Sequence, residues 1–311
     1  MDKIATRDAY GEKLVELGSK NKDIVVLDAD LAKSTKTILF KKKFPERFFD
    51  MGVAEQNLIG TAAGLSLAGK IPFASTFAIF ATGRTYDQLR NTVCYSRLNV
   101  RVVSSHAGLT VGEDGGSHQA LEDIALTRVL PNMAVIVPAD AVETQSVLDF
   151  AVAYKGPMYI RLGRPKVPIV CGDAYKFELG KGTVLREGSD ATIIAAGITV
   201  AMALEAANIL LEKGLEVEVI NMASIKPLDN QLIIESARRT GAVVTAEEHS
   251  IIGGLGGGVA ELLVENLPVP MERVGVRDSF GESGSPNELL EKYGITSHHI
   301  AAAVERVVSR K

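Results

Sequence analysis

Short apolar runs alternate with longer stretches of helical length through most of the chain. The runs are rich in β-branched residues and contain few polar positions, which is typical of strands covered on both faces of a parallel sheet. The longer stretches have the length of the helices that connect parallel strands. In the first half of the sequence, this pattern predicts strands at residues 24–27, 71–74, 100–103, 134–137 and 158–160, and a helix through residues 87–90.

A proline-containing stretch without periodicity, residues 166–180, interrupts this alternation, and we interpret it as a linker between two domains. The domains would span residues 1–165 and 181–311. The predicted fold is α/β, with two domains that are each a mainly parallel sheet flanked by helices. In the second domain the pattern predicts strands at residues 191–196, 217–220, 242–245 and 273–276, and helices at 201–213, after 230 and from about 256.

The segment that begins at Glu55 combines a lone carboxylate with a helix that is apolar or small on every side through residue 69. Such a helix is expected to be buried all round. Gly60 and Gly64, one turn apart, would let another helix approach closely. In a subunit interface, Glu55 would then face a shared and poorly hydrated site. The simpler interpretation is a carboxylate that interacts with the helix dipole, which contributes about 0.3–1 kcal/mol.

Charge and composition narrow the function classes. The formal net charge of -4 argues against nucleic-acid binding, and the basic cluster Lys41–Lys43 is too short to follow a phosphate backbone. Cys94 and Cys171 are far apart in sequence and indicate neither a disulfide framework nor a zinc site. The N-terminus has no apolar signal core, and no stretch reaches about 18 apolar residues. We therefore expect a cytoplasmic protein that does not span a membrane.

The densest group of polar residues, 104–119, directly follows a predicted strand. In an open parallel sheet, ligands bind beyond the carboxyl ends of the strands, so this loop lies where a site is expected. It contains His106 and His118, with Asp114 between them. Histidine is suited to moving protons near neutral pH, and a nearby carboxylate can orient it. The alternative is a loop whose polar residues bond only to one another and to water.

Two further pairs of residues in the first domain could contribute to a ligand site near this loop. Phe77 and Phe80 are three residues apart and would share one side of a helical turn, where two rings could hold a flat heterocycle. Aromatic pairs at this spacing are also common in protein cores. Arg7 lies near the N-terminus and Arg164 just after a predicted strand, and guanidinium groups near strand ends are suited to binding phosphate. Each could equally be a surface arginine.

The second domain offers weaker signals. Its glycine-rich run, residues 253–258, does not fit the G-x-G-x-x-G nucleotide-binding pattern, because Val259 stands at the final glycine position. Close packing of a helix explains these glycines better. His298 and His299 are expected to form a polar helix start, and His249 could lie at the domain interface.

Taken together, these motifs resemble the thiamine diphosphate enzymes of the transketolase type, over their pyrimidine-binding and C-terminal domains. The resemblance covers nearly the whole chain. The Glu55 segment is similar to the glutamate motif of that family, Phe77 to Phe80 to its aromatic clamp, and residues 112–119 to its substrate loop. In the second domain, residues 278–284 and 293–296 are similar to the transketolase C-terminal signature.

The resemblance implies cofactor-binding roles for four residues. Glu55 would bond to the pyrimidine nitrogen of thiamine diphosphate and so activate the cofactor. Phe77 and Phe80 would stack on the pyrimidine, and Asp30 would lie near the cofactor.

The resemblance also implies a set of substrate contacts. His118 and His106 would contact sugar hydroxyls and shuttle protons, while Asp114 would bind a substrate hydroxyl. The residues that match the positions binding the sugar phosphate are Arg7, Ser34, His106 and Arg164.

The chain also departs from the family. Gly83 stands where transketolases often have a third aromatic residue, and Ala54 and Gln56 flank Glu55 in place of the usual Arg and His. Nothing matches the Gly-Asp-Gly segment and later Asn that hold the cofactor diphosphate and its divalent metal, and the segment 172–174, Gly-Asp-Ala, is not that motif. Two phosphates without their metal and glycine-rich cradle would be poorly held.

We therefore infer that the chain is the C-terminal subunit of a split transketolase. A separate N-terminal subunit would hold most of the thiamine diphosphate and its Mg²⁺ or Ca²⁺, and this chain would contribute no metal ligand. The chain would self-associate, form a heterotetramer with that partner and be inactive alone. The implied reaction is the transfer of a two-carbon ketol unit between sugar phosphates of the pentose phosphate pathway.

Three alternatives stay open at this point. Residues 107–109, Ala-Gly-Leu, suggest a fragment similar to deoxyxylulose-phosphate synthase. The beta subunit of a 2-oxo-acid dehydrogenase has the same two domains in a two-chain arrangement. His106, Asp114 and His118 favour sugar-phosphate chemistry over the dehydrogenase, and His106 resembles transketolase more than the synthase. The third alternative, a non-catalytic scaffold, is disfavoured by the joint presence of the candidate residues.

Overall fold

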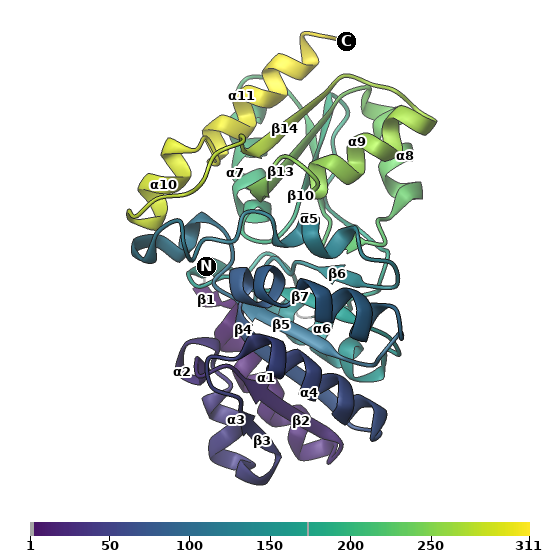
Figure 1. Ribbon diagram of the computed structural model, residues 1–311. Helices are drawn as coiled ribbons and strands as arrows, with labels where there is room; N and C mark the ends of the chain where they lie inside the picture. Colours follow the sequence, from purple (N-terminus) through teal and green to yellow (C-terminus); the bar gives the residue numbers. More distant parts are fainter. Residues whose placement is uncertain (1–2, 173) are drawn as a thin grey trace.

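The computed structural model describes residues 3–172 and 174–311. Asp173, within the predicted linker, and Met1 and Asp2 lie outside the described residues. The chain forms two α/β units, each built on a mainly parallel sheet flanked by helices, as predicted (Figure 1). No helix in the two described ranges is long and apolar enough to cross a membrane.

The first unit is built on a seven-stranded sheet with the order β12-β6-β7-β5-β4-β2-β3. Neighbouring strands are parallel except for β12, which is antiparallel to β6. Because β12 comes from the second half of the sequence, that half completes one edge of the first sheet. The strands are β2 (Ile24–Asp28), β3 (Phe48–Asp50), β4 (Ile71–Phe77), β5 (Arg101–Ser105), β6 (Ala134–Ile136), β7 (Met158–Arg161) and β12 (Ser224–Lys226).

Helices cover both faces of this sheet because its strands are apolar on both. In β2, Ile24 and Val26 pack in a cluster with α1 and α6, whereas Val25 and Leu27 pack in another with α4. This is the two-residue period of a strand. The helices are α1 (Thr6–Lys20), α2 (Ala32–Thr35), α3 (Ile38–Lys43), α4 (Glu55–Leu67), α5 (Asp123–Arg128) and α6 (Ala141–Ala153), with 3₁₀ turns at Pro45–Arg47 and Leu109–Asp114 and π-helical turns at Phe80–Arg84 and Gln88–Cys94.

The second unit is built on a five-stranded sheet with the order β14-β13-β10-β11-β9, parallel except for β9. A separate antiparallel pair, β1 with β8, joins the start of the chain to the segment that leaves the first unit. The strands are β1 (Lys3–Ala5), β8 (Lys166–Pro168), β9 (Thr183–Arg186), β10 (Ala191–Ala195), β11 (Val217–Asn221), β13 (Val243–Ser250) and β14 (Met271–Val276), and the helices are α7 (Thr199–Leu211), α8 (Asn230–Thr240), α9 (Leu255–Asn266), α10 (Pro286–Lys292) and α11 (Ser297–Val308).

The structure differs from the predicted elements mainly in short segments. The sequence pattern does not predict β3, β9 or β12, because strands of three or four residues carry little periodicity. Tertiary contacts decide their pairing instead. In β12, for example, the Lys226 ammonium donates to the main-chain oxygens of Arg128 and Leu130, at 2.7 and 2.5 Å. The helix expected through residues 87–90 is a π-helical turn.

Helix α4 begins at Glu55, but the expectation that it is buried all round is wrong for this chain. Leu58 and Ile59 are buried, whereas Gly60, Gly64 and Leu67 are exposed, Leu67 by 75%. Apart from the adjoining residues and backbone of α4 itself, no atom of the described residues lies within 4 Å of the place where a side chain at Gly60 or Gly64 would start. Gly60, Gly64 and Leu67 therefore form an open stripe on the surface of the part of the chain that the structure describes.

The strand β5, which leads into the polar loop, is anchored by a buried arginine. Arg101 donates from Nε to the main-chain oxygen of Ala151 at 2.6 Å and from Nη1 to that of Gly156 at 2.9 Å. Nη2 donates to the Asn99 side chain at 2.7 Å and to the Tyr154 main-chain oxygen. The cation thus satisfies carbonyl groups at the C-terminal end of α6, where positive charge is favoured. Burial lowers the pKa of Arg101 to about 10, so it stays charged at neutral pH.

Replacing Arg101 with Leu is expected to destabilise the chain by about 3 kcal/mol, because four acceptors, two of them buried and two half-buried, would lose their donor. Urea unfolding followed by circular dichroism measures the effect. The matched control is Arg306→Leu, which removes an exposed ion pair with Glu272 and should change stability by less than about 1 kcal/mol. Equal effects of the two substitutions would contradict the anchoring role of Arg101.

Candidate active site at the carboxyl edge of the first sheet

The candidate site begins where β2, β4 and β5 end side by side. Asp28 is paired with Ser75, and Phe77 with Ser105. Because the three strands are parallel, the residues that follow them emerge at one edge of the sheet. His106 directly follows Ser105 and has a φ of 57°, in the left-handed region that histidine tolerates better than most residues. This backbone turn leads from the strand into the polar loop.

The predicted aromatic pair lies at this edge with both histidines. The rings of Phe77 and Phe80 are stacked, with centroids 5.9 Å apart and planes at 13°. The imidazole of His106 stacks on Phe77 at 3.9 Å and 19°. The imidazole of His118 presents its edge to both phenylalanines, at 6.3 and 5.4 Å. Phe77 is the last residue of β4 rather than part of a helical turn, but the two rings do lie on one side.

The His106 ring is held at both nitrogens. Nε2 lies 3.1 Å from Nη1 of Arg7, and Nδ1 lies 2.8 Å from the hydroxyl oxygen of Ser105. Since a guanidinium can only donate, Nε2 accepts from Arg7 and Nδ1 carries the proton of a neutral ring. Arg7 also donates to the main-chain oxygen of Ser34 at 3.1 Å. Burial, and then the charges of Arg7 and Arg164, lower the pKa of His106 to about 3.

The Glu55 carboxylate is buried at the start of α4 and is paired with Arg84. Nη1 of Arg84 lies 2.7 Å from Oε1 of Glu55. The same guanidinium lies over the ring of Phe80, with its carbon 4.0 Å from the centroid. Gln56 also holds the backbone of Arg84, since its Nε2 donates to the Arg84 main-chain oxygen at 3.1 Å. Glu55, Gln56 and Arg84 line a surface pocket of about 510 Å³. Through Arg84 and Phe80, Glu55 is connected to the aromatic and histidine groups.

The polar loop is held toward the site by Arg164. Its Nη1 donates to the main-chain oxygen of Val111, and it lies 3.5 Å from the Glu113 carboxylate and 3.8 Å from that of Asp114. Asp114 is exposed, and His118 is half-buried with Nδ1 2.9 Å from the Ser117 hydroxyl. Both side chains are therefore placed beside the site with room to contact a ligand.

Asp30 lies apart from this group, since no hydrogen bond, ion pair or ring contact among the described residues joins its side chain to it. It is exposed, and its main-chain nitrogen donates to the Asp50 carboxylate at 3.2 Å. The nearby buried carboxylate is Asp28, which accepts from the hydroxyls of Thr35 and Thr37 at 2.7 and 2.8 Å. Burial raises the pKa of Asp28 to about 6. Asp28 thus shapes the loop that carries Asp30 and Ser34.

The structure adds two site residues that the sequence reasoning missed. Arg84 stands four residues after Phe80, so helical spacing could have indicated the contact between them. Ser105, the partner of His106 Nδ1, is adjacent in sequence but gave no distinct signal. Their roles follow from the direction of their side chains, which a sequence pattern does not give.

The assembled group offers three kinds of chemistry. A buried carboxylate can bond to a ligand nitrogen, and two aromatic faces can stack on a flat ring. A neutral imidazole beside a guanidinium can take part in hydrogen bonding and proton movement around an oxygen-rich substrate. The paired cations Arg7 and Arg164 suit an anionic group.

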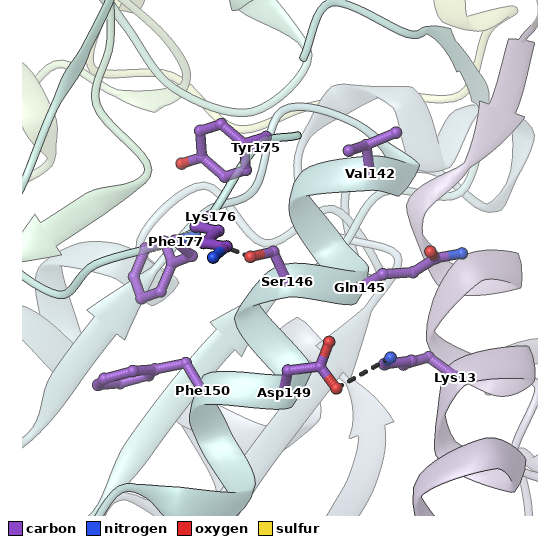
Figure 2. Close-up of a pocket in the computed structure, with 9 residues that line it drawn as sticks. All are labelled: Lys13, Val142, Gln145, Ser146, Asp149, Phe150, Tyr175, Lys176 and Phe177. Carbon is purple, nitrogen blue, oxygen red and sulfur yellow. Dashed lines mark hydrogen bonds and ion pairs between the residues drawn. The ribbon is translucent and has the colours of Figure 1, made fainter. Parts of the chain in front are cut away.

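A second pocket of about 510 Å³ lies between α1, α6 and the residues after Asp173 (Figure 2). Several of its polar residues already have partners: Lys13 pairs with Asp149 at 2.9 Å, and the Ser146 hydroxyl accepts from the Phe177 main-chain nitrogen at 2.7 Å. It shares no lining residue with the candidate site, so we do not assign it a ligand.

The weaker signals of the second domain are structural. His249 is buried at the domain interface, as expected, and its Nε2 accepts from the main-chain nitrogen of Ala125 at 3.4 Å. A side chain at Gly254 would collide with Glu247, so the glycines let α9 approach β13. His299 bonds to the Thr296 hydroxyl at the start of α11. Among the residues that the structure describes, no three His, Cys, Asp or Glu side chains are arranged to hold a metal.

The buried, neutral His106 predicts a pH dependence of stability. Its pKa is about 3 in the folded chain and about 6.5 when unfolded, so the unfolded chain binds more protons between these values. Its contribution is complete above about pH 6.5 and is lost as the pH falls toward 3. The stability difference between wild type and His106→Asn should therefore shrink by about 1 kcal/mol per pH unit from pH 6.5 to 4.5. Urea titrations at several pH values measure it, and a constant difference would contradict the prediction.

Comparison with known proteins assigns both units of the chain to domains of one enzyme family. Residues 2–170 match the transketolase pyrimidine binding domain, and residues 180–300 match the transketolase C-terminal domain. The chain is 51% identical to a transketolase C-terminal section of Methanocaldococcus jannaschii, over 96% of this chain and 94% of the relative. It is 46% identical to a 6-deoxy-6-sulfo-D-fructose transketolase subunit of a Clostridium species, over 98% of this chain and 95% of the relative.

A solved structure with a similar fold also belongs to a split transketolase. It is described as a split gene transketolase in an inactive beta4 tetramer, and it superposes with a TM-score of 0.93 at 59% identity, covering 98% of this chain and 99% of the other. The chain therefore belongs to the transketolase family, as a split-transketolase chain with a pyrimidine-binding and a C-terminal domain.

Proposed function

We propose that this chain is a subunit of a thiamine diphosphate-dependent transketolase, which transfers a two-carbon ketol unit between sugar phosphates together with an N-terminal subunit. The observation that carries the proposal is the continuous set of contacts from Glu55 and Arg84 through the two phenylalanines to His106 and Arg7. It brings a carboxylate, two aromatic faces and a neutral imidazole beside a cation to one sheet edge.

The pyrimidine end of the cofactor fits the residues present. The Arg84 guanidinium is flat and carries N–H groups, and it stacks on Phe80 while it bonds to Glu55. An aminopyrimidine ring needs the same two contacts. Glu55, Phe77 and Phe80 would hold it, with Asp30 at the margin. When bound, thiamine diphosphate supplies the nucleophilic carbon that carries the two-carbon unit.

The sugar would lie across the histidines with its anionic end between two arginines. Burial, and also the charge of Arg164, lower the pKa of Arg7, although Asp8 acts in the opposite direction. An anion between Arg7 and Arg164 would relieve this repulsion, with the Ser34 loop beside it. His106, His118 and Asp114 would bond to sugar hydroxyls, and the two imidazoles would move protons. Phosphate and sulfonate both suit such a pair of cations. Because the Clostridium relative is named for a sulfonated sugar, an experiment has to decide between a sugar phosphate and a sugar sulfonate as the substrate.

The proposal assigns the diphosphate and its Mg²⁺ or Ca²⁺ to the partner, because this sequence lacks the Gly-Asp-Gly segment. The open stripe of Gly60, Gly64 and Leu67 on α4 supports association with a second copy beside Glu55. Two copies of each chain would form the heterotetramer, in the cytoplasm and with the pentose phosphate pathway as its setting.

Ketol transfer is expected only when both chains are present. The assay follows transfer from xylulose 5-phosphate to ribose 5-phosphate with thiamine diphosphate and Mg²⁺, using this chain alone, the N-terminal-type chain of the same organism alone, and both together. A parallel series with 6-deoxy-6-sulfo-fructose as the donor tests the sulfonated sugar. Transfer by this chain alone would contradict the two-chain assignment. No transfer from either donor by the mixture would contradict the transketolase activity.

In the active mixture, Glu55→Gln is expected to lower kcat by about 10²-fold or more, because an amide cannot exchange a proton with the cofactor ring. The fold should persist, since glutamine keeps the shape and an acceptor for Arg84. The control is Glu12→Gln, an exposed carboxylate on α1. Near-normal turnover of Glu55→Gln, with cofactor bound, would remove the activating role of Glu55.

A further inference from the structure

The second domain contacts the outer segment of the polar loop, residues 108–119, through a buried carboxylate. Glu248 lies in β13 and is 4% exposed. Its Oε1 accepts from the main-chain nitrogen of Thr110 at 2.6 Å. A side chain at Gly108 would start 2.3 Å from the Glu248 carboxyl carbon, and Gly108 has a φ of 80°. The loop therefore begins with a glycine that allows both the backbone turn and the close approach of Glu248.

The other end of the loop is tied to the same domain. Nε2 of Gln119 donates to the main-chain oxygen of Glu282 at 2.9 Å. It also lies 3.3 Å from the main-chain oxygen of Leu109 and 3.2 Å from that of Gly112. A side chain at Gly281 would collide with Gln119. The segment 281–286 thus packs along the far side of the loop.

A buried arginine joins these two attachments. Nη2 of Arg161 donates to the main-chain oxygen of Glu248 at 2.9 Å and to that of Ala120 at 3.2 Å. The main-chain nitrogen of Gly108 in turn donates to Ala120 at 2.9 Å, which closes the base of the loop. Arg161 therefore holds the backbone of Glu248, while the carboxylate of Glu248 holds the backbone of Thr110.

Between these attachments the loop carries Asp114 and His118, the side chains that face the candidate sugar site. We propose that Glu248 is a positioning residue: through Thr110 it sets where the loop places Asp114 and His118, and thereby the affinity of the enzyme for its sugar. This inference rests on the proposed function and assigns the C-terminal domain a part in substrate binding.

The charge of Glu248 is linked to closure of the loop. Burial raises the pKa of Glu248 to about 7, while Arg161 and the Thr110 N–H act to lower it. Asp123 also faces it, whereas Glu247 and His249 alternate to the other face of β13. In an open, solvated loop the carboxyl would return toward its ordinary pKa of 4.5. The closed loop therefore holds the proton more tightly, and closure weakens as the pH rises from about 4.5 to 7.

Three variants of the reconstituted two-chain enzyme test the proposal. Glu248→Ala should raise the KM for the sugar about tenfold, the loss expected when the buried Thr110 N–H is left without its acceptor, while the Kd for thiamine diphosphate stays at the wild-type value. Glu248→Gln keeps an acceptor for Thr110 and should largely restore the KM. Glu247→Gln is the matched control on the same strand, because its carboxylate receives the first N–H groups of α9 instead of the loop. It should leave the KM unchanged.

Amide hydrogen exchange of the loop gives a readout that does not need activity. Protection of residues 109–119, corrected for intrinsic exchange, should fall about tenfold between pH 5.5 and 7 in the wild type and stay constant in Glu248→Gln. A wild-type KM and unchanged loop protection in Glu248→Ala would overturn the proposal, as would a pH step that persists in Glu248→Gln. An inactive wild-type mixture would instead count against the proposed function, and the exchange data would still decide the role of Glu248.

Discussion

The two domains meet around a buried ion pair between Arg161 and Asp123. Nε of Arg161 lies 2.8 Å from Oδ2 of Asp123, which also accepts from the Tyr159 hydroxyl at 2.6 Å. Burial alone would raise the pKa of Asp123, yet Arg161, His249 and the Tyr159 hydroxyl together outweigh it and the pKa is lowered. Removing one partner of such a pair leaves an isolated charge in the interior, at a cost of about 3–5 kcal/mol. Since Arg161 also holds the backbone at Ala120 and Glu248, this pair fixes where the second sheet sits relative to the polar loop.

The site depends on that placement because the loop belongs to one domain and is restrained by the other. Its base continues β5, whose end is aligned with β4 by the parallel register. Its outer part rests against Glu248 and the segment 281–286. A change in the angle between the domains would therefore move Asp114 and His118 while leaving Phe77 and His106 in place. The part of the site fixed to the first sheet and the part carried by the loop are thus separable in mechanical terms.

Sequence periodicity could predict what depends on burial and could not predict what depends on side-chain direction. The strand that contains Ile24 and Val26 is apolar on both faces, so its place inside a parallel sheet follows from the pattern. The start of α4 at Glu55 and the edge position of His106 follow similarly. The pairing of β12 and the contact of Glu248 with Thr110 join residues that are distant in sequence, and only tertiary packing decides them. The pattern wrongly predicts that α4 is buried on all sides within this chain. Small apolar residues give the same pattern whether they are covered by the same chain or by another one.

Arg84 gives the isolated chain an internal competitor for its own site. The guanidinium covers the Phe80 face and neutralises Glu55, although 49% of its side chain is exposed to solvent. A flat heterocycle that stacks on Phe80 and bonds to Glu55 can bind only after Arg84 has moved away. Because the arginine is tethered, its effective concentration at the site exceeds that of a dilute ligand. The free chain therefore keeps its buried carboxylate paired until a ligand offers both contacts at once.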